Sequence, residues 1–246
     1  MVQNEMEGTM RKRRPSALLS LVLLLFFRGT SSAEERFQTG GHFILGFPQG
    51  EFRSNADRIG LGGDFYFAYH VPRSILSAGI SIGFSIYGRE TREEPLSPTI
   101  PEMIVDVSTT NSIVLGHLFL RLQPRTGMFR PYLDGLVGFH YLTTDTTIHD
   151  NCDGDGDITS NNHNDLAFSY GAGAGTQVTL IQGIRQDNKQ RLFSMDLDIG
   201  IRYLRGGEAE YMKKGSIHRE IDGVIYDVYR SRTDLVKAYI GLNFSF

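Results

Sequence analysis

The chain has 246 residues, of which 40% are hydrophobic and 22% charged, and its formal net charge is −3 at pH 7. A single cysteine, Cys152, excludes an intrachain disulfide, and the acidic balance argues against nucleic-acid binding. Beyond the N-terminal segment no apolar run is long enough for a membrane helix, so hydrophobic residues are spread over alternating segments.

The first 33 residues predict a cleaved signal peptide. Residues 11–14 are basic, and residues 17–27 form an apolar segment that is too short to cross a bilayer as a helix. Ser31 and Ala33 supply small residues three and one before a cut, which favours cleavage after Ala33. A short membrane anchor is the alternative.

The mature protein is then expected to be one domain, residues 34–246. Removal of residues 1–33 takes away five basic and two acidic residues, which changes the net charge from −3 to −6. Met10 directly precedes the basic residues and is an alternative start to Met1.

Eight segments alternate between apolar and polar residues, the period that sorts side chains onto opposite faces of a strand. In chain order they are residues 41–47, 60–70, 75–87, 111–122, 130–143, 166–180, 192–204 and 233–246. The pattern is weakest in the fourth, because Ile113, Leu115 and Phe119 share the face that carries polar residues. Most of these segments suit the roughly 9 to 11 residues that a tilted strand needs to cross the hydrocarbon.

An apolar outer face and a polar inner face are typical of a membrane barrel, whereas a soluble lipocalin-like barrel shows the inverse. An even number of strands closes the sheet and leaves no edge in lipid. Small inward residues fit eight strands, whose interior is just wide enough for side chains. The sequence therefore predicts an all-β fold: an eight-stranded antiparallel transmembrane up-and-down β-barrel.

The connections between these segments alternate in length. The shorter ones are residues 70–74, 123–129 and 181–191, and the mostly longer, polar ones are residues 48–58, 88–110, 144–165 and 205–232. Outer-membrane barrels have short periplasmic turns and long extracellular loops. We therefore expect both termini in the periplasm and the longer loops outside the cell.

The last segment ends on an aromatic residue with apolar residues at every second position before it, including Phe244. This ending resembles the C-terminal targeting signal of Gram-negative outer-membrane barrels, so Phe244 and Phe246 are candidate targeting residues. The resemblance implies location in the outer membrane of a Gram-negative bacterium and insertion by the barrel-assembly machinery.

The barrel as a whole resembles the small OmpA-like and OmpW-like proteins, and five strings resemble a group of uncharacterised outer-membrane β-barrel domain proteins. The strings are FPQGEF (47–52), RPYLDGLVGF (130–139), SYGAGAG (169–175), GGEAEYMKKGSI (206–217) and SRTDL (231–235). The resemblance covers nearly all the mature chain and implies a porin-like or surface-structural protein without an assigned substrate. We expect no counterpart of the peptidoglycan-binding domain of full-length OmpA-type proteins, which puts a cell-wall tether in doubt. We expect the protein to be a monomer. Outer-membrane lipid and lipopolysaccharide are expected to surround it.

The string NCDGDGD offers a candidate calcium loop, with ligands Asn151, Asp153, Asp155 and Asp157 around a glycine turn. Its twelfth position is Asn162, where a calcium loop has a bidentate Glu. The alternative is a solvated acidic loop tip. No other cofactor is expected.

Charged and imidazole side chains on the inward faces form a second candidate site, because ionisable groups at membrane depth need partners. They are Asp64, His117, Arg121, Asp134, Asp196, Asp198, Arg202 and Lys237. They could form a charged pore constriction or an ion-pair network that fills the interior, and the narrow barrel favours the network. We expect Asp198 to pair with Lys237 or Arg202, with Asp64 and Asp134 in the same network.

A lipid-modifying enzyme of the outer leaflet would need a nucleophile, a base and an orienting group. The candidate residues are His140, His149, Ser160, His163 and His218, but no motif orders them. The prediction is therefore a structural or surface-interaction role without enzymatic activity. A narrow porin-like channel for small solutes is the alternative, and the enzyme is the third possibility.

Overall fold

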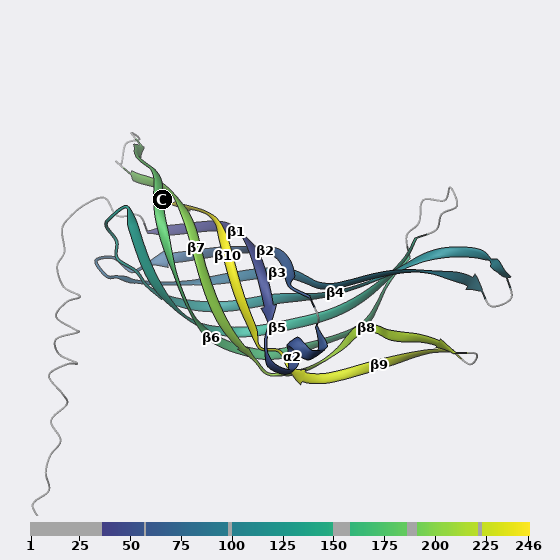
Figure 1. Cartoon of the computed structure of the whole chain (residues 1–246). Helices are drawn as coiled ribbons and strands as arrows, with labels where there is room; N and C mark the ends of the chain where they lie inside the picture. The colour runs from purple at the N-terminus through teal and green to yellow at the C-terminus, as the bar shows by residue number, and fades with distance from the viewer. Residues whose placement is uncertain (1–35, 57, 98–99, 150–157, 186–190, 221–222) are drawn as a thin grey trace, which may run out of the picture.

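The structure is a computed structural model that describes residues 36–56, 58–97, 100–149, 158–185, 191–220 and 223–246. Eight antiparallel strands close into a barrel in the order β1-β10-β7-β6-β5-β4-β3-β2 (Figure 1). The barrel strands are β1 (Phe37–Pro48), β2 (Gly60–His70), β3 (Leu76–Ser97), β4 (Ile100–Leu122), β5 (Phe129–His149), β6 (Ile158–Arg185), β7 (Arg191–Gly206) and β10 (Leu235–Ser245). The predicted eight-stranded antiparallel barrel is confirmed.

The first and last barrel strands join to close the sheet. Their register runs from Gln38 opposite Ser245 to Pro48 opposite Leu235. At the terminal end, the Phe246 amide donates to the Phe37 carbonyl at 2.9 Å, and the Phe37 amide donates to the Phe246 carbonyl at 3.0 Å. The C-terminal residue therefore completes the seam, and no barrel strand is left with an open edge within the closed sheet.

Burial alternates along the barrel strands as the two-residue period requires. In β10, for example, Lys237, Tyr239 and Asn243 are buried while Ile240, Leu242 and Phe244 are exposed. Glycines occupy inward positions where adjacent strands approach closely: a Cβ at Gly62 or Gly138 would collide with a carbonyl oxygen of the neighbouring strand. None of the described helices is long and apolar enough to span a membrane.

Four strands continue well beyond the barrel at the end opposite the termini, which we call the hairpin end (Figure 1). Residues 88–110 and 144–165, which we expected as loops, lie mostly in strands of these hairpins. Arg89 to Pro95 pair with Ile104 to Thr110, and Asp106 to Thr110 pair with Asp145 to His149. The prediction missed them because stretches such as Arg89 to Glu94 are charged on both faces and lack an apolar alternation.

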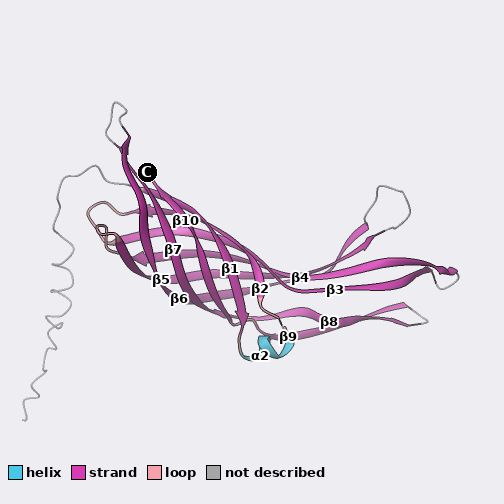
Figure 2. Ribbon diagram, turned by 45° about the horizontal axis from the view of Figure 1, so that its top comes forward, coloured by secondary structure: helices cyan, strands magenta, loops and turns pink. Residues whose placement is uncertain are grey.

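The segment 205–232, also expected as a loop, contains a two-stranded sheet of β8 (Glu208–Glu220) and β9 (Gly223–Arg232). The segment 48–58 contains a six-residue helix, α2 (Gly50–Asn55). Figure 2 shows α2 at the base of β8 and β9. Phe52 of α2 is fully buried, with its ring 5.4 Å from that of Tyr87 and 5.3 Å from that of Tyr211.

Hydrogen bonds fix this helix to the β8–β9 sheet. The Asn55 side-chain amide donates to the Tyr211 hydroxyl at 2.7 Å, and the Arg232 backbone amide donates to the Glu51 carboxylate at 3.4 Å. Tyr211 in turn bonds the Ser231 hydroxyl at 2.7 Å. The helix and the sheet therefore form one cover over the hairpin end.

Below this cover the lumen is filled with apolar side chains. Ile44, Leu115, Leu142, Leu204 and Leu235 come from five strands and are at most 3% exposed. The weak alternation of the fourth predicted segment has its reason here, since its inward aliphatic residues belong to this layer. The remainder of the lumen, toward the termini, is mainly polar.

Candidate functional site

The inward faces of the barrel strands bring a dense polar cluster together in the lumen. All eight side chains that we predicted to face inward are buried and at most 6% exposed, although His117 and Asp196 have partners of their own: Asp64, His117, Arg121, Asp134, Asp196, Asp198, Arg202 and Lys237. Arg130, at 8% exposed, joins them. The four buried carboxylates are thus matched by four buried Arg and Lys side chains in the described part of the lumen.

Asp134 on β5 is held by two arginines. Arg121 donates from Nε to Oδ1 at 2.8 Å and from Nη2 to Oδ2 at 3.0 Å, a bidentate contact. Arg202 donates from Nε and Nη2 to Oδ2 at 3.2 and 2.9 Å. The Arg121 guanidinium also stacks 3.6 Å from the centre of the Tyr132 ring. One carboxylate therefore connects β4, β5 and β7 across the lumen.

Lys237 does not pair with Asp198 as we expected. Its Nζ donates to Oδ2 of Asp64 at 2.6 Å, and the Ser81 hydroxyl donates to the same oxygen at 2.9 Å. Lys237 and Arg202 face each other across β10 and β7, whereas Asp198 lies opposite Gly241, four residues further along β10. Four residues of strand span about 13 Å, so the two cations reach different carboxylates across the lumen.

Asp198 instead accepts hydrogen bonds mainly from neutral groups. Its donors are the Tyr132 hydroxyl at 2.5 Å, the Asn243 amide at 2.8 Å and the Gln177 amide at 3.3 Å. The nearest arginine nitrogen, Nη1 of Arg121, lies 3.6 Å away. Our prediction that Asp198 pairs with Arg202 is therefore also wrong.

His42, which we did not predict, connects the two acidic centres. Its Nδ1 lies 3.3 Å from Oδ1 of Asp64, and its Nε2 lies 3.1 Å from Oδ1 of Asn243 and 3.5 Å from Oδ2 of Asp198. Because the Asn243 amide nitrogen donates to Asp198, its oxygen faces the imidazole. Both ring nitrogens thus face acceptors, the arrangement of an imidazolium. The sequence feature that could have identified His42 is its inward position in the first alternating segment.

Asp196 lies nearer the termini with its own partners. Nη2 of Arg130 is 2.5 Å from Oδ2, and the Thr179 hydroxyl donates to Oδ1 at 2.8 Å. Neighbouring amides of Gln38, Gln123 and Gln177 are linked by hydrogen bonds of 2.9 to 3.2 Å. This layer of polar side chains lies on the terminal side of the lumen.

His117 belongs to a separate chain of hydrogen bonds. Its Nε2 lies 3.0 Å from the Ser169 hydroxyl, which lies 2.9 Å from Nε2 of His140. Nδ1 of His140 lies 3.2 Å from the Thr233 hydroxyl. A serine between two imidazoles has the groups of a nucleophilic site. However, Ser169 and His140 are each 0% exposed, so no substrate reaches them in this arrangement.

The other candidate catalytic residues lie on different elements from Ser169 and His140 or elsewhere along the same strands. Ser160 and His163 fall on the β6 extension, and His149 and His218 on β5 and β8. The candidate calcium ligands Asn151, Asp153, Asp155 and Asp157 lie outside the described residues. Within the described ranges no group of three or more His, Cys, Asp or Glu could hold a metal ion.

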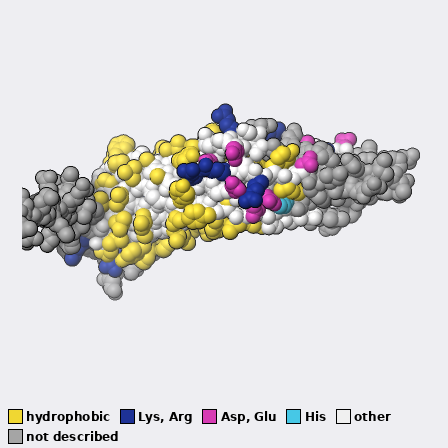
Figure 3. Space-filling view, turned by 90° about the horizontal axis from the view of Figure 1, so that it is seen from below, with side chains coloured by type: hydrophobic (Ala, Val, Ile, Leu, Met, Phe, Trp, Pro, Cys, Tyr) yellow, Lys and Arg dark blue, Asp and Glu magenta, His cyan; other side chains and the backbone are white. Residues whose placement is uncertain are grey.

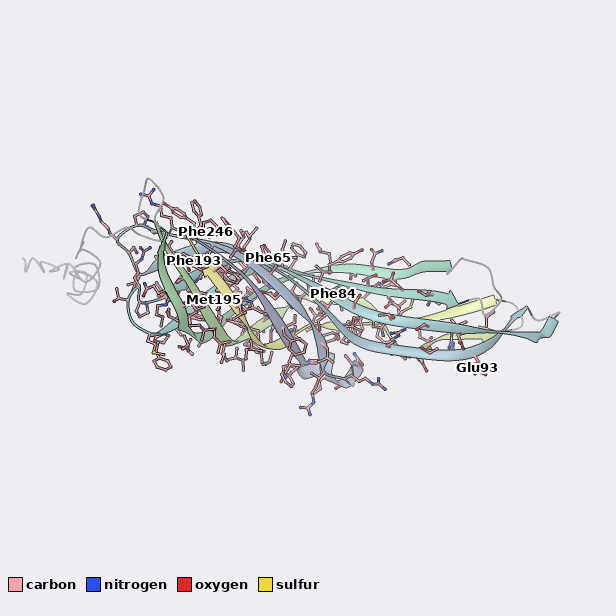
Figure 4. All side chains as sticks on the ribbon, turned by 90° about the horizontal axis from the view of Figure 1, so that it is seen from above. Phe65, Phe84, Glu93, Phe193, Met195 and Phe246 are labelled. Atoms are coloured by element: carbon pink, nitrogen blue, oxygen red, sulfur yellow. The ribbon has the colours of Figure 1, made fainter. Side chains whose placement is uncertain are left out.

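The candidate targeting residues lie on the outer face at the terminal end. Phe244 and Phe246 are 37% and 46% exposed. The Phe246 ring is 6.2 Å from that of Phe37, and the Phe244 ring is 6.3 Å from that of Phe193. Figure 4 places Phe246 and Phe193 at this end and Glu93 on the far extension.

Comparisons with solved structures return outer-membrane and surface proteins. Neisserial surface protein A (NspA) is 12% identical, with 85% of this chain and 96% of that chain covered and a TM-score of 0.37. Ail, the attachment invasion locus protein of Yersinia pestis, is 13% identical over 86% and 97% of the two chains, with a TM-score of 0.38. A major outer membrane protein of Thermus thermophilus is 12% identical over 85% and 99%, with a TM-score of 0.38.

A scan of protein-family models finds no match, and neither does a search of curated proteins. With TM-scores of 0.37 and 0.38, the assignment of the barrel rests on the strand pairing of this chain itself.

Proposed function

We propose that the protein is an integral outer-membrane β-barrel with a structural or surface-interaction role and a lumen closed to solutes. The observation that carries the location is the exposed outer face of the barrel. Phe65, Ile82, Leu118, Leu133 and Ile201, from five different strands, are 52 to 60% exposed. Figure 3 shows hydrophobic side chains over much of the barrel, with the acidic side chains toward the hairpin end.

An apolar surface of this extent is unfavourable in water but matches the hydrocarbon of a bilayer. The closed sheet satisfies its own backbone hydrogen bonds, which is a requirement in lipid. On this proposal the termini lie in the periplasm, the hairpins lie outside the cell, and lipopolysaccharide surrounds the outer half. Calcium binding by residues 151–157 remains a proposal based on the sequence alone.

Three layers support a closed lumen. The glutamine layer lies toward the termini, the ion pairs lie in the middle, and the aliphatic side chains lie under α2. Every charged member of the middle layer has a partner of opposite charge or a hydrogen bond, so water and ions find no unpaired charge there.

Conductance across a planar bilayer tests the closed lumen against the narrow channel. We expect no steps from the purified barrel at physiological salt. The test variant is Phe52→Ala combined with Leu115→Ala, which thins the apolar layer, and Leu133→Ala on the outer face is the matched control. Stable unitary steps from the unmodified protein would favour the channel instead.

Assembly of the barrel in the outer membrane tests the proposed location of the protein. Phe246→Asp places a charge where the seam and the aromatic contacts meet, so we expect the variant to stay in the periplasm without heat-modifiable migration. Phe37→Tyr keeps an aromatic ring at the same seam and serves as the control. Normal migration of the Phe246→Asp variant in the outer-membrane fraction would contradict the targeting role. Analysis of lipid A from a deletion strain tests the third possibility, an outer-leaflet enzyme, and we expect no change.

A further inference from the structure

The outer face of the barrel carries a strip of small side chains along β6. Ala172 and Ala174 of β6 are exposed, and Gly135 of β5 lies directly opposite Ala172. A Cβ added to Gly135 would meet nothing within 4 Å, so this glycine borders open space on the outer face. Packing within the protein therefore does not require the absence of a side chain at this position.

Large side chains border this small-residue strip on both sides. In the strand register, Leu133 of β5 and Ile201 of β7 flank Ala174, and Tyr203 of β7 lies beside Ala172. All three large side chains are exposed. The rows on β5 and β7 are about 10 Å apart, twice the spacing of neighbouring strands. The strip between them is therefore as wide as one extended hydrocarbon chain.

A cation lies at the hairpin end of the strip. Arg205 is the last outward side chain of β7, and it lies directly opposite Tyr170 of β6. Both side chains are exposed. Ala174 is four residues from Tyr170, or about 13 Å along the strand. Apolar strip, aromatic ring and guanidinium thus follow one another toward the hairpin end, in the order of the chain and headgroup of a lipid.

Arg205 has no hydrogen bond or ion pair with any residue that the structure describes. The carboxylate of Asp234 lies next to the last pair of β7 with β10, but it is already engaged. It accepts from the Gly206 amide at 3.0 Å and lies 3.3 Å from Nη2 of Arg232. A guanidinium at the edge of an apolar surface needs a counter-charge, and a lipid headgroup can supply it.

We propose that the small-residue strip holds an acyl chain of one lipid A molecule and that Arg205 binds its phosphate. The inference rests on the proposed location, in which the hairpin end faces the outside of the cell and the surrounding leaflet is made of this phosphorylated glycolipid. The planar guanidinium matches two phosphate oxygens at once. Tyr170 and Tyr203 lie where aromatic rings meet lipid headgroups.

Binding of defined lipids to the full barrel in detergent tests the site. Native mass spectrometry counts the bound lipid and gives a dissociation constant for bisphosphorylated lipid A, for lipid A without phosphates and for phosphatidylglycerol. We expect the unmodified barrel to bind bisphosphorylated lipid A about tenfold more tightly than the other two lipids. Tenfold is the order expected from one charge-assisted contact.

Two pairs of variants separate the headgroup from the acyl chain. Arg205→Gln should weaken binding of bisphosphorylated lipid A about tenfold and leave binding of the form without phosphates unchanged. Arg58→Gln is its matched control, because Arg58 is also exposed but directly precedes β2, four strands from β6. Gly135→Leu places a branched side chain in the strip and should weaken binding of both forms of lipid A. Gly41→Leu on β1 is its control, because a Cβ there also meets nothing within 4 Å.

Heat-modifiable migration and outer-membrane fractionation check that each variant forms the barrel, and they keep two kinds of failure apart. If Arg205→Gln fractionates normally and binds lipid A like the unmodified protein, the lipid site is wrong while the proposed location stands. If the unmodified protein is absent from the outer-membrane fraction, the location itself is wrong.

The controls and the lipid series can also overturn the site. Equal effects of Arg205→Gln and Arg58→Gln would remove the role of Arg205, and equal effects of Gly135→Leu and Gly41→Leu would remove the role of the strip. Phosphatidylglycerol that binds as tightly as bisphosphorylated lipid A would show that the occupant is a phospholipid instead.

Discussion

Carboxylate–arginine pairs occur in two regions of the molecule, and their geometry is nearly the same. In the lumen, Nη2 of Arg202 lies 2.9 Å from Asp134, with side chains 1% and 0% exposed. On the β8–β9 sheet, Nε of Arg230 lies 3.0 Å from Glu208, with side chains 66% and 58% exposed. The distances differ by 0.1 Å, whereas burial differs almost completely.

Burial decides how much such a pair contributes to the stability of the protein. Water competes for both members of the outer pair, so its formation changes the free energy of folding little. In the lumen neither charge can return to water while the barrel is closed, so each depends on the other. The lumen network therefore connects the strands across the interior, and removal of a single member leaves its partner without a counter-charge.

The largest expected effect is that of Asp134→Asn. The change removes the charge that neutralises both Arg121 and Arg202 and leaves two cations in the lumen. Loss of one partner of a buried ion pair lowers the free energy of unfolding by about 3 to 5 kcal/mol. Urea unfolding in lipid vesicles, followed by circular dichroism because the chain has no tryptophan, measures it. Glu93→Gln on the exposed extension is the control, and an equal midpoint for both variants would contradict the role of burial.

Lys237→Met should have the next largest effect. It leaves Asp64 without its closest cation, but His42 and Ser81 still contact this carboxylate at 3.3 and 2.9 Å. The loss in the free energy of unfolding should therefore be smaller, about 2 to 3 kcal/mol.

A second substitution added to Lys237→Met can identify the partner of Lys237. Asp64→Asn added to Lys237→Met should recover part of the loss, because it removes the stranded charge. Asp198→Asn added to Lys237→Met should recover nothing, because the two side chains do not meet. Recovery with Asp198→Asn alone would show that the lumen pairs differently from the structure.

The contrast between Asp64 and Asp198 also shows how far sequence reasoning reaches. Alternation in residues 233–246 places Lys237 inward, because a two-residue period depends only on the strand itself. The partner of Lys237 depends on barrel stagger, which brings β2 and β10 to the same level through β1, and no local pattern in the sequence encodes it. His42 was missed for a related reason: an isolated inward histidine gains its role only from side chains on other strands.

The outer regions were harder to predict than the barrel. An apolar face identifies a strand that borders lipid, but the extension of β3 is charged on both faces and β8 pairs only with β9. In the fourth segment, Ile113 and Leu115 weakened the expected pattern because the apolar layer under α2 is inside the barrel. The alternation of apolar and polar faces along each strand was enough to predict the fold. The partners of the lumen side chains depend on the register between strands, which these faces do not reveal.

Glu208→Gln, on the exposed sheet, should give the smallest effect on the free energy of unfolding. The variant removes the outer ion pair with Arg230, yet both groups are then solvated rather than stranded. We expect the free energy of unfolding to change by less than about 1 kcal/mol. Salt sharpens the test: raising sodium chloride from about 0.05 to 0.5 M shortens the screening length several-fold, so the small effect of Glu208→Gln should vanish while that of Asp134→Asn persists. An effect of Glu208→Gln as large as that of Asp134→Asn would mean that the β8–β9 pair is shielded from water, for instance by neighbouring lipid headgroups, and that burial in the isolated chain understates its role.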